Sequence, residues 1–319
     1  MSSTGEVMID VDRVTKYYGT LKALDNISFK LHRGEVLGFL GPNGAGKTTT
    51  MKILTCYFSP SSGKVKVRGL DVFDKSREVR ALIGYLPENA PLYGEMTARE
   101  YLEFVGDVRE IPHRNINSRI NSIAEVCGLT DVLEREIRTL SKGYRQRVGL
   151  AQAMIHDPEV IILDEPTSGL DPNQIVEIRK LIKEIGKEKT IILSTHNLSE
   201  VQVTCNRVII IHKGKIVADS PTDKIQQQMG PSKFKVVFKK NGISKDEIAE
   251  QLKSLSGVST VSESANPEEG TISFDIDGKG DEDLRVKFFD FAVEKKLKLL
   301  ELRREKLNLE SIFMEITQE

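Results

Sequence analysis

The sequence has no long apolar run, few cysteines and almost no net charge, and each of these absences excludes a class of protein. No uninterrupted apolar segment approaches the roughly 18 residues that cross a bilayer, so we expect no membrane-spanning helix in this sequence. The first residues, MSSTGEVMID, lack the basic and apolar regions of a signal peptide. We therefore expect the chain to remain in the cytoplasm.

The cysteines and the charge exclude two further classes. Cys56, Cys127 and Cys205 are odd in number, widely separated and not spaced as pairs of metal ligands. We expect reduced thiols that pack in the interior rather than disulfides or a metal centre. A net charge of −1 gives no reason to expect nucleic acid or an anionic membrane surface as a partner.

What the sequence does contain is a glycine-rich segment, GPNGAGKTT, at residues 41–49. It lies between the apolar run 36–40 and the helix-compatible segment 48–54, as a phosphate-binding loop requires. Its glycines allow positive φ and a close approach to a polyphosphate, and the amides at the start of the helix point at the anion. Lys47 would reach the β and γ phosphates, and the Thr48 hydroxyl would ligate Mg²⁺.

We interpret this segment as an ATP site. Its predicted nucleotide-binding residues are Gly41, Pro42, Asn43, Gly44, Ala45, Gly46, Lys47, Thr48 and Thr49. Tyr18 lies ahead of the loop, and its ring could stack on adenine. The alternative for Tyr18 is an aromatic side chain that packs on the edge of a sheet.

Apolar patterning predicts an α/β fold. Alternation predicts strands near residues 9–14 and 27–31, and a short strand within 59–72. The fully apolar run VIILD at 160–164 is typical of a buried parallel strand, and TIILST and RVIII predict two more. Strands that alternate with helices imply a parallel sheet whose ligands lie at the carboxyl ends of the strands. The loop at Gly41, the acids after Leu163 and the histidine after Thr195 should therefore converge.

Residues 97–156 interrupt this alternation and predict a helical subdomain. Thr97 and Glu100 form a capping box, and an apolar face from Ile116 to Cys127 ends at Gly128. We place the first domain at 1–221, with an antiparallel β subdomain beside the phosphate loop. Residues 222–319 follow the order βαββαβ of a small α+β ferredoxin-like domain, closed by a helix that carries Leu309 and Phe313.

Four segments together resemble the ATP-binding subunit of an ABC transporter. They are GPNGAGKTT, LSKGYRQR (140–147), VIILDEPTSGLD (160–171) and STH (194–196). The resemblance covers about residues 6–220 and implies a P-loop NTPase core. It implies that Asp164 holds Mg²⁺, that Glu165 is the general base, and that His196 binds the γ phosphate and keeps base and water in line. Taken singly, an acid pair after a strand could be a simple turn, and a lone histidine is usually structural.

The resemblance also implies a second half of the site. Ser141 and Gly143 open a helix whose N-terminus is an anion site. In the family, a head-to-tail dimer brings this helix onto the partner's nucleotide, and Asp171 communicates across the contact. The partner could be a second copy or a paralogue.

Two positions depart from the common family pattern. Lys142 and Tyr144 replace a glycine and a glutamine of the usual LSGGQ, a variant found in exporters of drugs, antibiotics and polysaccharides and in the gliding-motility type. Glu88 stands where most members carry a glutamine that links Mg²⁺ and the attacking water to the membrane subunit, so Glu88 is a predicted metal and catalytic residue. The segment YLPENAPLYGEMTAREYLEF looks most like the gliding-motility branch.

The implied function is ATP hydrolysis that powers export through a membrane permease on a separate chain. The protein would then sit peripherally on the cytoplasmic face of the membrane, with its permease near Glu88 and the 97–140 helices. The carboxy-terminal domain could steady the dimer or regulate it. Two alternatives remain, a soluble ABC ATPase acting on ribosomes or DNA and a nucleotide-dependent regulator that does not hydrolyse ATP. The cargo cannot be named from this sequence.

Overall fold

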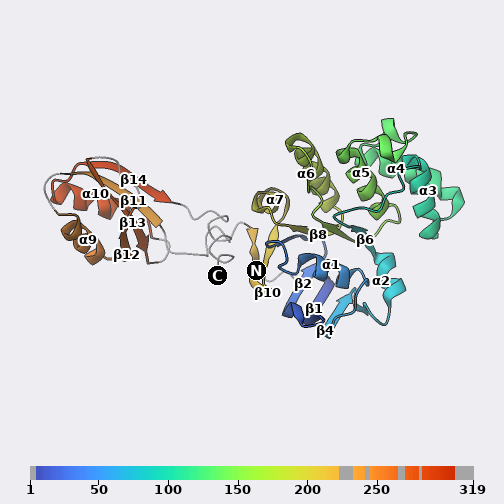
Figure 1. The fold of residues 1–319 in the computed structure, drawn as a ribbon, viewed down its shortest axis with the longest axis horizontal. Coiled ribbons are helices and arrows are strands. Elements are labelled where there is room, and N and C mark those ends of the chain that lie inside the picture. Colours follow the sequence, from blue (N-terminus) through green and yellow to red (C-terminus); the bar gives the residue numbers. More distant parts are fainter. Residues whose placement is uncertain (1–4, 223–232, 241–243, 265–269, 280–281, 306–319) are drawn as a thin grey trace. The chain divides into compact units, whose positions relative to one another are not determined.

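The computed structural model describes residues 5–222, 233–240, 244–264, 270–279 and 282–305. The chain forms two compact units, Met1–Thr222 and Asp223–Glu319 (Figure 1). The predicted last helix, with Leu309 and Phe313, lies outside the described residues. None of the described helices is both long and apolar enough to span a bilayer.

The first unit is built around a six-stranded sheet in which five strands are parallel. In spatial order its strands are β10 (Lys215–Pro221), β9 (Arg207–His212), β3 (Val36–Leu40), β8 (Thr190–Thr195), β7 (Val160–Asp164) and β6 (Ile83–Leu86). The parallel sheet predicted from the apolar runs is confirmed, since every residue of β3, β7 and β8 is buried. Strand β10 was missed because it pairs antiparallel at the edge, where every second residue is exposed and no apolar run forms.

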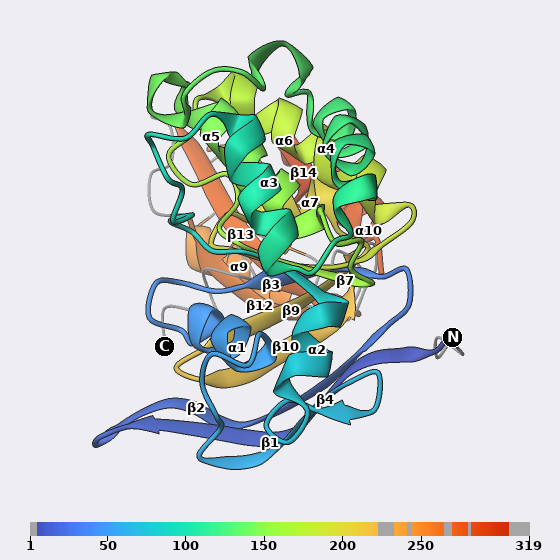
Figure 2. The ribbon, with the colours of Figure 1, turned by 90° about the vertical axis from the view of Figure 1, so that its right-hand side faces the viewer.

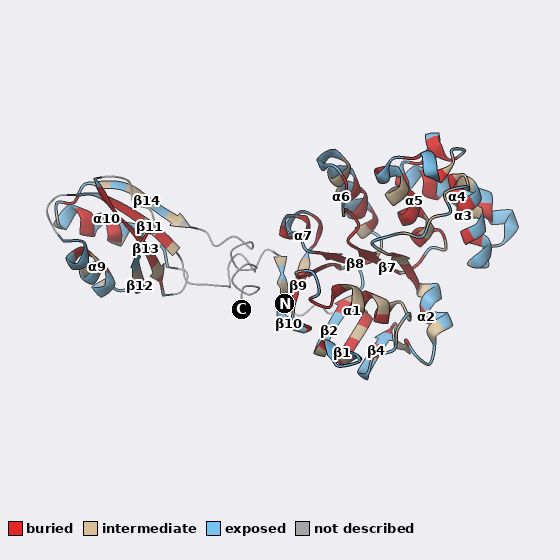
Figure 3. Ribbon diagram, in the orientation of Figure 1, coloured by how far each residue is buried: buried red, intermediate tan, exposed pale blue. Residues whose placement is uncertain are grey.

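A four-stranded antiparallel sheet faces the central sheet across helix α1 (Lys47–Leu54), and Figure 2 shows the two sheets on opposite sides of that helix. Its strands are β2 (Leu21–His32), β1 (Val7–Tyr18), β4 (Ser62–Val67) and β5 (Leu70–Asp71). One continuous apolar core includes side chains from both sheets and from α1. Burial of this core holds α1 against the strand ends, and Figure 3 shows the central strands buried along their length.

The helices cover the rest of the first unit. They are α2 (Ser76–Leu82), α3 (Ala98–Val108), α4 (His113–Cys127), α5 (Lys142–Met154), α6 (Pro172–Gly186) and α7 (Leu198–Thr204). Helices α3, α4 and α5 pack on one another as the predicted helical subdomain, and the Thr97–Glu100 capping box is present. Gly128 ends α4 in the left-handed conformation at φ 65°. The two seven-residue helices, α2 and α7, were not predicted because each is too short for a clear apolar period.

The second unit has the element order of the ferredoxin-like motif. Its elements are β11 (Lys233–Lys239), α9 (Lys245–Ser254), β12 (Val258–Glu263), β13 (Thr271–Gly278), α10 (Arg285–Glu294) and β14 (Leu299–Glu305). The sheet is antiparallel in the order β12-β13-β11-β14. Alternate residues of β11, namely Phe234, Val236 and Phe238, enter a core shared with Phe288 of α10.

Candidate nucleotide-binding site

The glycine-rich loop joins β3 to α1, and two of its glycines are required by backbone conformation. Gly44 has φ 79° and Gly46, the residue before α1, has φ 112°. A side chain at Gly46 would also meet the Ala23 carbonyl oxygen at 2.8 Å. We expected positive φ at Gly41 as well, but its backbone does not take that conformation. It is needed for space instead, because a Cβ there would lie 2.4 Å from the Ile211 carbonyl oxygen.

A cleft of about 690 Å³ opens over this loop, a size typical of small-molecule sites. It is lined by Tyr18, Leu21, Lys22, Ala23, Asn43, Gly44, Gly46, Lys47, Thr48, Thr49, Glu88, Glu165, Ser168, His196, Lys213 and Gly214. Predicted residues from five separate segments of the sequence therefore meet in one place. Gly41, Pro42 and Ala45 belong to the loop but not to the cleft lining.

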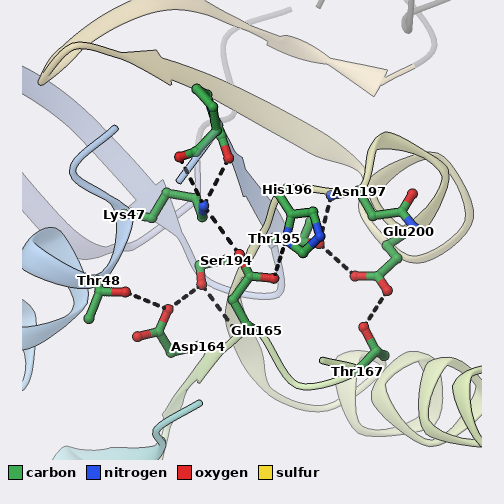
Figure 4. Close-up of polar contacts among 12 residues, drawn as sticks. Lys47, Thr48, Asp164, Glu165, Thr167, Ser194, Thr195, His196, Asn197 and Glu200 are labelled. Atoms are coloured by element: carbon green, nitrogen blue, oxygen red, sulfur yellow. Dashed lines mark hydrogen bonds and ion pairs between the residues drawn. The ribbon is translucent and has the colours of Figure 1, made fainter. Parts of the chain in front are cut away.

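Lys47 is buried at the base of the cleft, and its ammonium group is compensated on two sides. Its Nζ atom donates to the carbonyl oxygens of Gly41 at 2.8 Å and Pro42 at 3.3 Å. The same atom lies 3.2 Å from Oε1 of Glu165, whose side chain is only 9% exposed. The Lys47 ammonium group is thus held beside the phosphate loop by carbonyl and carboxylate oxygens, and the oxygens of a phosphate could replace them (Figure 4).

Glu165 is held from both of its carboxylate oxygens. Oε1 faces Lys47, and Oε2 lies 2.9 Å from Nδ1 of His196. The backbone of Glu165 takes φ 49°, a left-handed conformation that is uncommon outside glycine. The side chain of His196 is 57% exposed, so one face of this pair is open to a ligand. This pairing of an acid that ends β7 with a histidine that follows β8 agrees with the convergence predicted at the strand ends.

Asp164 lies one residue before Glu165 and is almost fully buried. Its Oδ1 atom accepts hydrogen bonds from the Thr48 hydroxyl at 3.4 Å and from the Ser194 hydroxyl. The Ser194 hydroxyl also accepts a hydrogen bond from the backbone N–H of Glu165 at 3.1 Å. Ser194 therefore orients both acids. The sequence motif contained Ser194, but nothing in its spacing indicated this contact.

The donor set beside Asp164 suits Mg²⁺. Thr48 and Asp164 bring two hard oxygen ligands together, and Glu88 adds an exposed carboxylate at the cleft wall. Among the described residues, no three His, Cys, Asp or Glu side chains gather as a metal site. Such a sparse set fits Mg²⁺, which binds through one or two carboxylates and completes its shell with water and phosphate oxygens.

Three predicted residues, Ser141, Gly143 and Asp171, do not line the cleft. Ser141 precedes α5 and accepts from the N–H of Tyr144 at 3.4 Å, while Asp171 precedes α6 and accepts from the N–H of Gln174 at 3.0 Å. A Cβ on Gly143 would meet the Gln174 side chain at 2.8 Å, so these two helix starts lie side by side.

Six residues of the cleft lining were not predicted from the sequence, namely Leu21, Lys22, Ala23, Ser168, Lys213 and Gly214. Lys213 and Gly214 follow β9 at its carboxyl end, so the rule that placed the other residues could have found them. Lys22 lies in β2, whose start borders the cleft only through the packing of the antiparallel sheet. Tyr18 does line the cleft, and it also packs edge-on against Phe58 with ring centroids 5.8 Å apart.

Comparison with known proteins agrees with this geometry. The family described as ABC transporter matches residues 24–168. The bacitracin transport ATP-binding protein BcrA of Bacillus licheniformis is 38% identical over 69% of this chain and 72% of its own length. The linearmycin resistance ATP-binding protein LnrL of Bacillus subtilis is 31% identical over 97% of this chain and 98% of its own.

The fold comparison extends to solved structures. The ABC transporter cassette MJ0796, solved as a dimer, superposes with a TM-score of 0.62 at 26% identity. The superposition covers 67% of this chain and 99% of the cassette. A second structure of the same cassette contains ADP and phosphate. The chain belongs to the ABC transporter family as an ATP-binding subunit, an ABC ATPase whose named relatives are of the exporter type.

Proposed function

We propose that this chain hydrolyses Mg²⁺-bound ATP in the cleft over Lys47, with Glu165 as general base, and so powers export through a membrane permease. The observation that carries the proposal is the series of contacts from Lys47 to Glu165 to His196. It places a cation, a carboxylate and an imidazole beside the phosphate loop, where hydrolysis needs charge stabilisation and an oriented base.

The contacts suggest how the base becomes available. In the structure described above, Glu165 is shared between Lys47 and His196, so its carboxylate is not free to take a proton from water. Phosphate oxygens would attract the Lys47 ammonium away from Glu165, because the two anions compete for one cation. His196 would then hold the freed carboxylate from Oε2 while Oε1 faces the attacking water. Mg²⁺ would neutralise charge on the phosphates between Thr48 and Asp164.

The closed site needs a second cassette. Ser141, Gly143 and Asp171 lie at helix starts away from the cleft of their own chain. A head-to-tail dimer would bring the N-terminus of α5 to the partner's γ phosphate, where its amides and dipole stabilise the anion. The dimer of the similar cassette MJ0796 supports this arrangement. Two copies or a pair of paralogues would satisfy it equally.

A groove of about 510 Å³ between α2, α3 and α5 is our candidate for the permease contact. Phe104 and Val108 of α3 are exposed in it, 40% and 65%, beside the guanidinium groups of Arg80 and Arg109. Arg77 also lines the groove but is paired with Glu110 at 2.7 Å. Burial and the neighbouring Arg80 lower the pKa of Arg109. Apolar and cationic groups together suit a short acidic and apolar segment of a partner. Such a partner would place the protein on the cytoplasmic face of the membrane.

The names of two relatives bear on the cargo of the proposed transporter. The names of BcrA and LnrL refer to bacitracin transport and linearmycin resistance, which favours export of a small toxic compound. The gliding-motility assignment remains a prediction from residues 85–104 alone. The net charge of −1 does not favour a nucleic acid partner.

Glu165→Gln tests the proposal. We expect ATP turnover to fall by about 1,000-fold while ATP binding persists, because the amide keeps the shape of the side chain but cannot accept the proton. The matched control is Glu188→Gln, an exposed carboxylate beyond the end of α6. Turnover would be followed by phosphate release and binding by titration with a fluorescent nucleotide. Unchanged turnover in Glu165→Gln would remove Glu165 as the base, and no turnover in the native chain would favour a regulator.

A further inference from the structure

Glu200 is a buried carboxylate that none of the proposed catalytic steps uses. It lies in α7 and is only 3% exposed. Its Oε2 atom accepts a hydrogen bond from the Thr195 hydroxyl at 2.7 Å, and its Oε1 atom accepts one from the Thr167 hydroxyl. The two threonines are themselves buried, so neither hydroxyl has water as a substitute partner.

The positions of the two threonines show which segments the Glu200 carboxylate connects. Thr167 comes two residues after Glu165, and Thr195 comes one residue before His196. One side chain therefore joins the segment that carries the proposed base to the segment that carries the histidine (Figure 4). Thr167 follows β7 and Thr195 ends β8, and these two strands pair as far as Asp164 and Ser194. Glu200 adds a connection beyond the end of that pairing.

The charge of Glu200 is also compensated by an ion pair. Nη2 of Arg179 on α6 lies 3.6 Å from Oε1, and the Nε atom of Arg179 is buried with no partner among the described residues. A carboxylate so deeply buried costs several kcal/mol of solvation unless hydrogen bonds and charge offset it. An apolar residue at this place would pack at less cost, so packing alone does not account for an acid here.

The backbone around Glu165 takes an uncommon conformation, which is a further reason for its segment to need support. Glu165 takes φ 49°, and its backbone N–H donates a hydrogen bond to the hydroxyl of Ser194 in β8. Ser194 and Thr195 are consecutive residues of one strand, so their side chains point to opposite faces. Residues 164–167 are thus fastened at one end by Ser194 and at the other by Glu200.

We propose that Glu200 is a positioning residue that sets the distance between Glu165 and His196 by bridging Thr167 and Thr195. Glu200 does not line the cleft over Lys47. Its effect on turnover passes through the orientation of Glu165, because a displacement of about 1 Å in a reacting group can cost about 100-fold in rate. The inference rests on the proposed role of Glu165 and goes beyond it by naming what places that base.

Thr167→Val is the decisive variant, because it keeps the shape of the side chain and removes one end of the bridge. We expect kcat to fall about 10- to 100-fold, with KM for ATP changed less than about threefold. The matched control is Thr204→Val, the same substitution at a buried threonine in α7, whose hydroxyl has no partner among the described residues. Equal kcat in Thr167→Val and Thr204→Val would overturn the proposal.

A double-mutant cycle separates positioning from general loss of stability. If Glu200 acts through Glu165, Thr167→Val should have almost no further effect on single-turnover hydrolysis in a Glu165→Gln background. A full additional 10- to 100-fold loss in that background would contradict the inference. Glu200→Gln, which can still bond both threonines with one bond reversed, should fall between the native chain and Thr167→Val. Thermal unfolding of each variant measures folding independently of turnover.

The same experiments distinguish the two levels of the argument. If Glu165→Gln retains native turnover, the proposed base is wrong and the bridge loses its purpose. If Glu165→Gln abolishes turnover but Thr167→Val does not reduce it, the base stands and the positioning role of Glu200 is rejected.

Discussion

The two units bury different kinds of side chain. The first unit buries Lys47, Asp164, Glu165 and Glu200 near the carboxyl ends of its parallel strands. In the described part of the second unit, the buried polar side chains are the hydroxyls of Ser264, Thr271 and Ser273. These need one partner each and carry no charge, as in the Ser273–Ser264 hydrogen bond of 2.9 Å.

The difference in buried side chains indicates that the first unit carries the chemistry and that the second unit is a packed domain without buried charges in its described part. Burial of an unpaired charge is costly, so a cluster of buried charges persists where their reactivity is used. The second unit instead fills its core with aromatic rings, with Phe234 and Phe288 edge-on at 5.3 Å. We therefore expect substitutions in the first unit to change turnover and those in the second to change stability.

The largest effect should come from Lys47→Ala. It removes the cation that we propose faces the phosphates, and it leaves the Glu165 carboxylate in contact with His196. We expect hydrolysis to fall by about 1,000-fold and nucleotide affinity to fall with it, since a buried charge that stabilises phosphate is lost. Lys52→Ala at the other end of α1 is the control, because Lys52 does not line the cleft. Nucleotide titration and phosphate release measure both quantities.

Phe288→Ala tests the other side of the comparison. Phe288 is fully buried, and its truncation should destabilise the second unit by about 3 to 5 kcal/mol. Phe289→Ala, the exposed neighbour on α10, should change stability little. Urea unfolding followed by circular dichroism measures the loss, and phosphate release at low temperature measures turnover. A matching fall in turnover would show that the second unit supports the nucleotide site, for example by steadying the dimer.

All five histidines lie in the first unit, and one of them makes its stability depend on pH. Burial lowers the pKa of His156 from 6.5 to about 4. The unfolded chain then binds a proton between pH 6.5 and 4 that the folded chain does not, so stability falls as the pH is lowered through this range. At pH 5 the loss should be about 2 kcal/mol relative to neutral pH.

His156→Gln is the matched variant for that prediction. The amide can still donate to the Ile83 carbonyl, which His156 Nε2 reaches at 3.0 Å, but it does not titrate. Urea unfolding of both proteins at pH 7 and pH 5 should show a smaller difference in the variant. An equal difference would assign the pH dependence to other groups.

The smallest effect concerns the three cysteines, which all lie in the first unit. The predicted reduced thiols are present as free cysteines, with Cys127 and Cys205 buried and Cys56 half-buried. Burial raises the pKa of Cys56 to about 11 and of Cys127 to about 12, and it also raises the pKa of Cys205. Few thiolates exist at pH 8, so a thiol reagent should label the folded chain slowly and the urea-unfolded chain completely.

Short-range sequence patterns predicted much of the fold. The apolar runs at 160–164 and 190–195, the capping box at Thr97 and the glycine that ends α4 at residue 128 were each visible as short-range signals. These features depend on neighbours within a few residues, which a sequence displays directly. The edge strand β10 and the short helices α2 and α7 escaped prediction because long-range packing, not local period, stabilises them.

For the site, the sequence alone determined which residue types meet, because parallel strands bring their carboxyl ends to one edge and the motifs follow those ends. Gly46, Lys47, Glu165 and His196 could be assigned to one cleft on that ground. Only the tertiary structure decided that Gly41 serves close packing and that Ser194 and Glu200 fasten the segment around Glu165. The reason is physical: a hydrogen bond depends on the relative position of two segments to within a fraction of an ångström, and spacing along the chain does not specify that position.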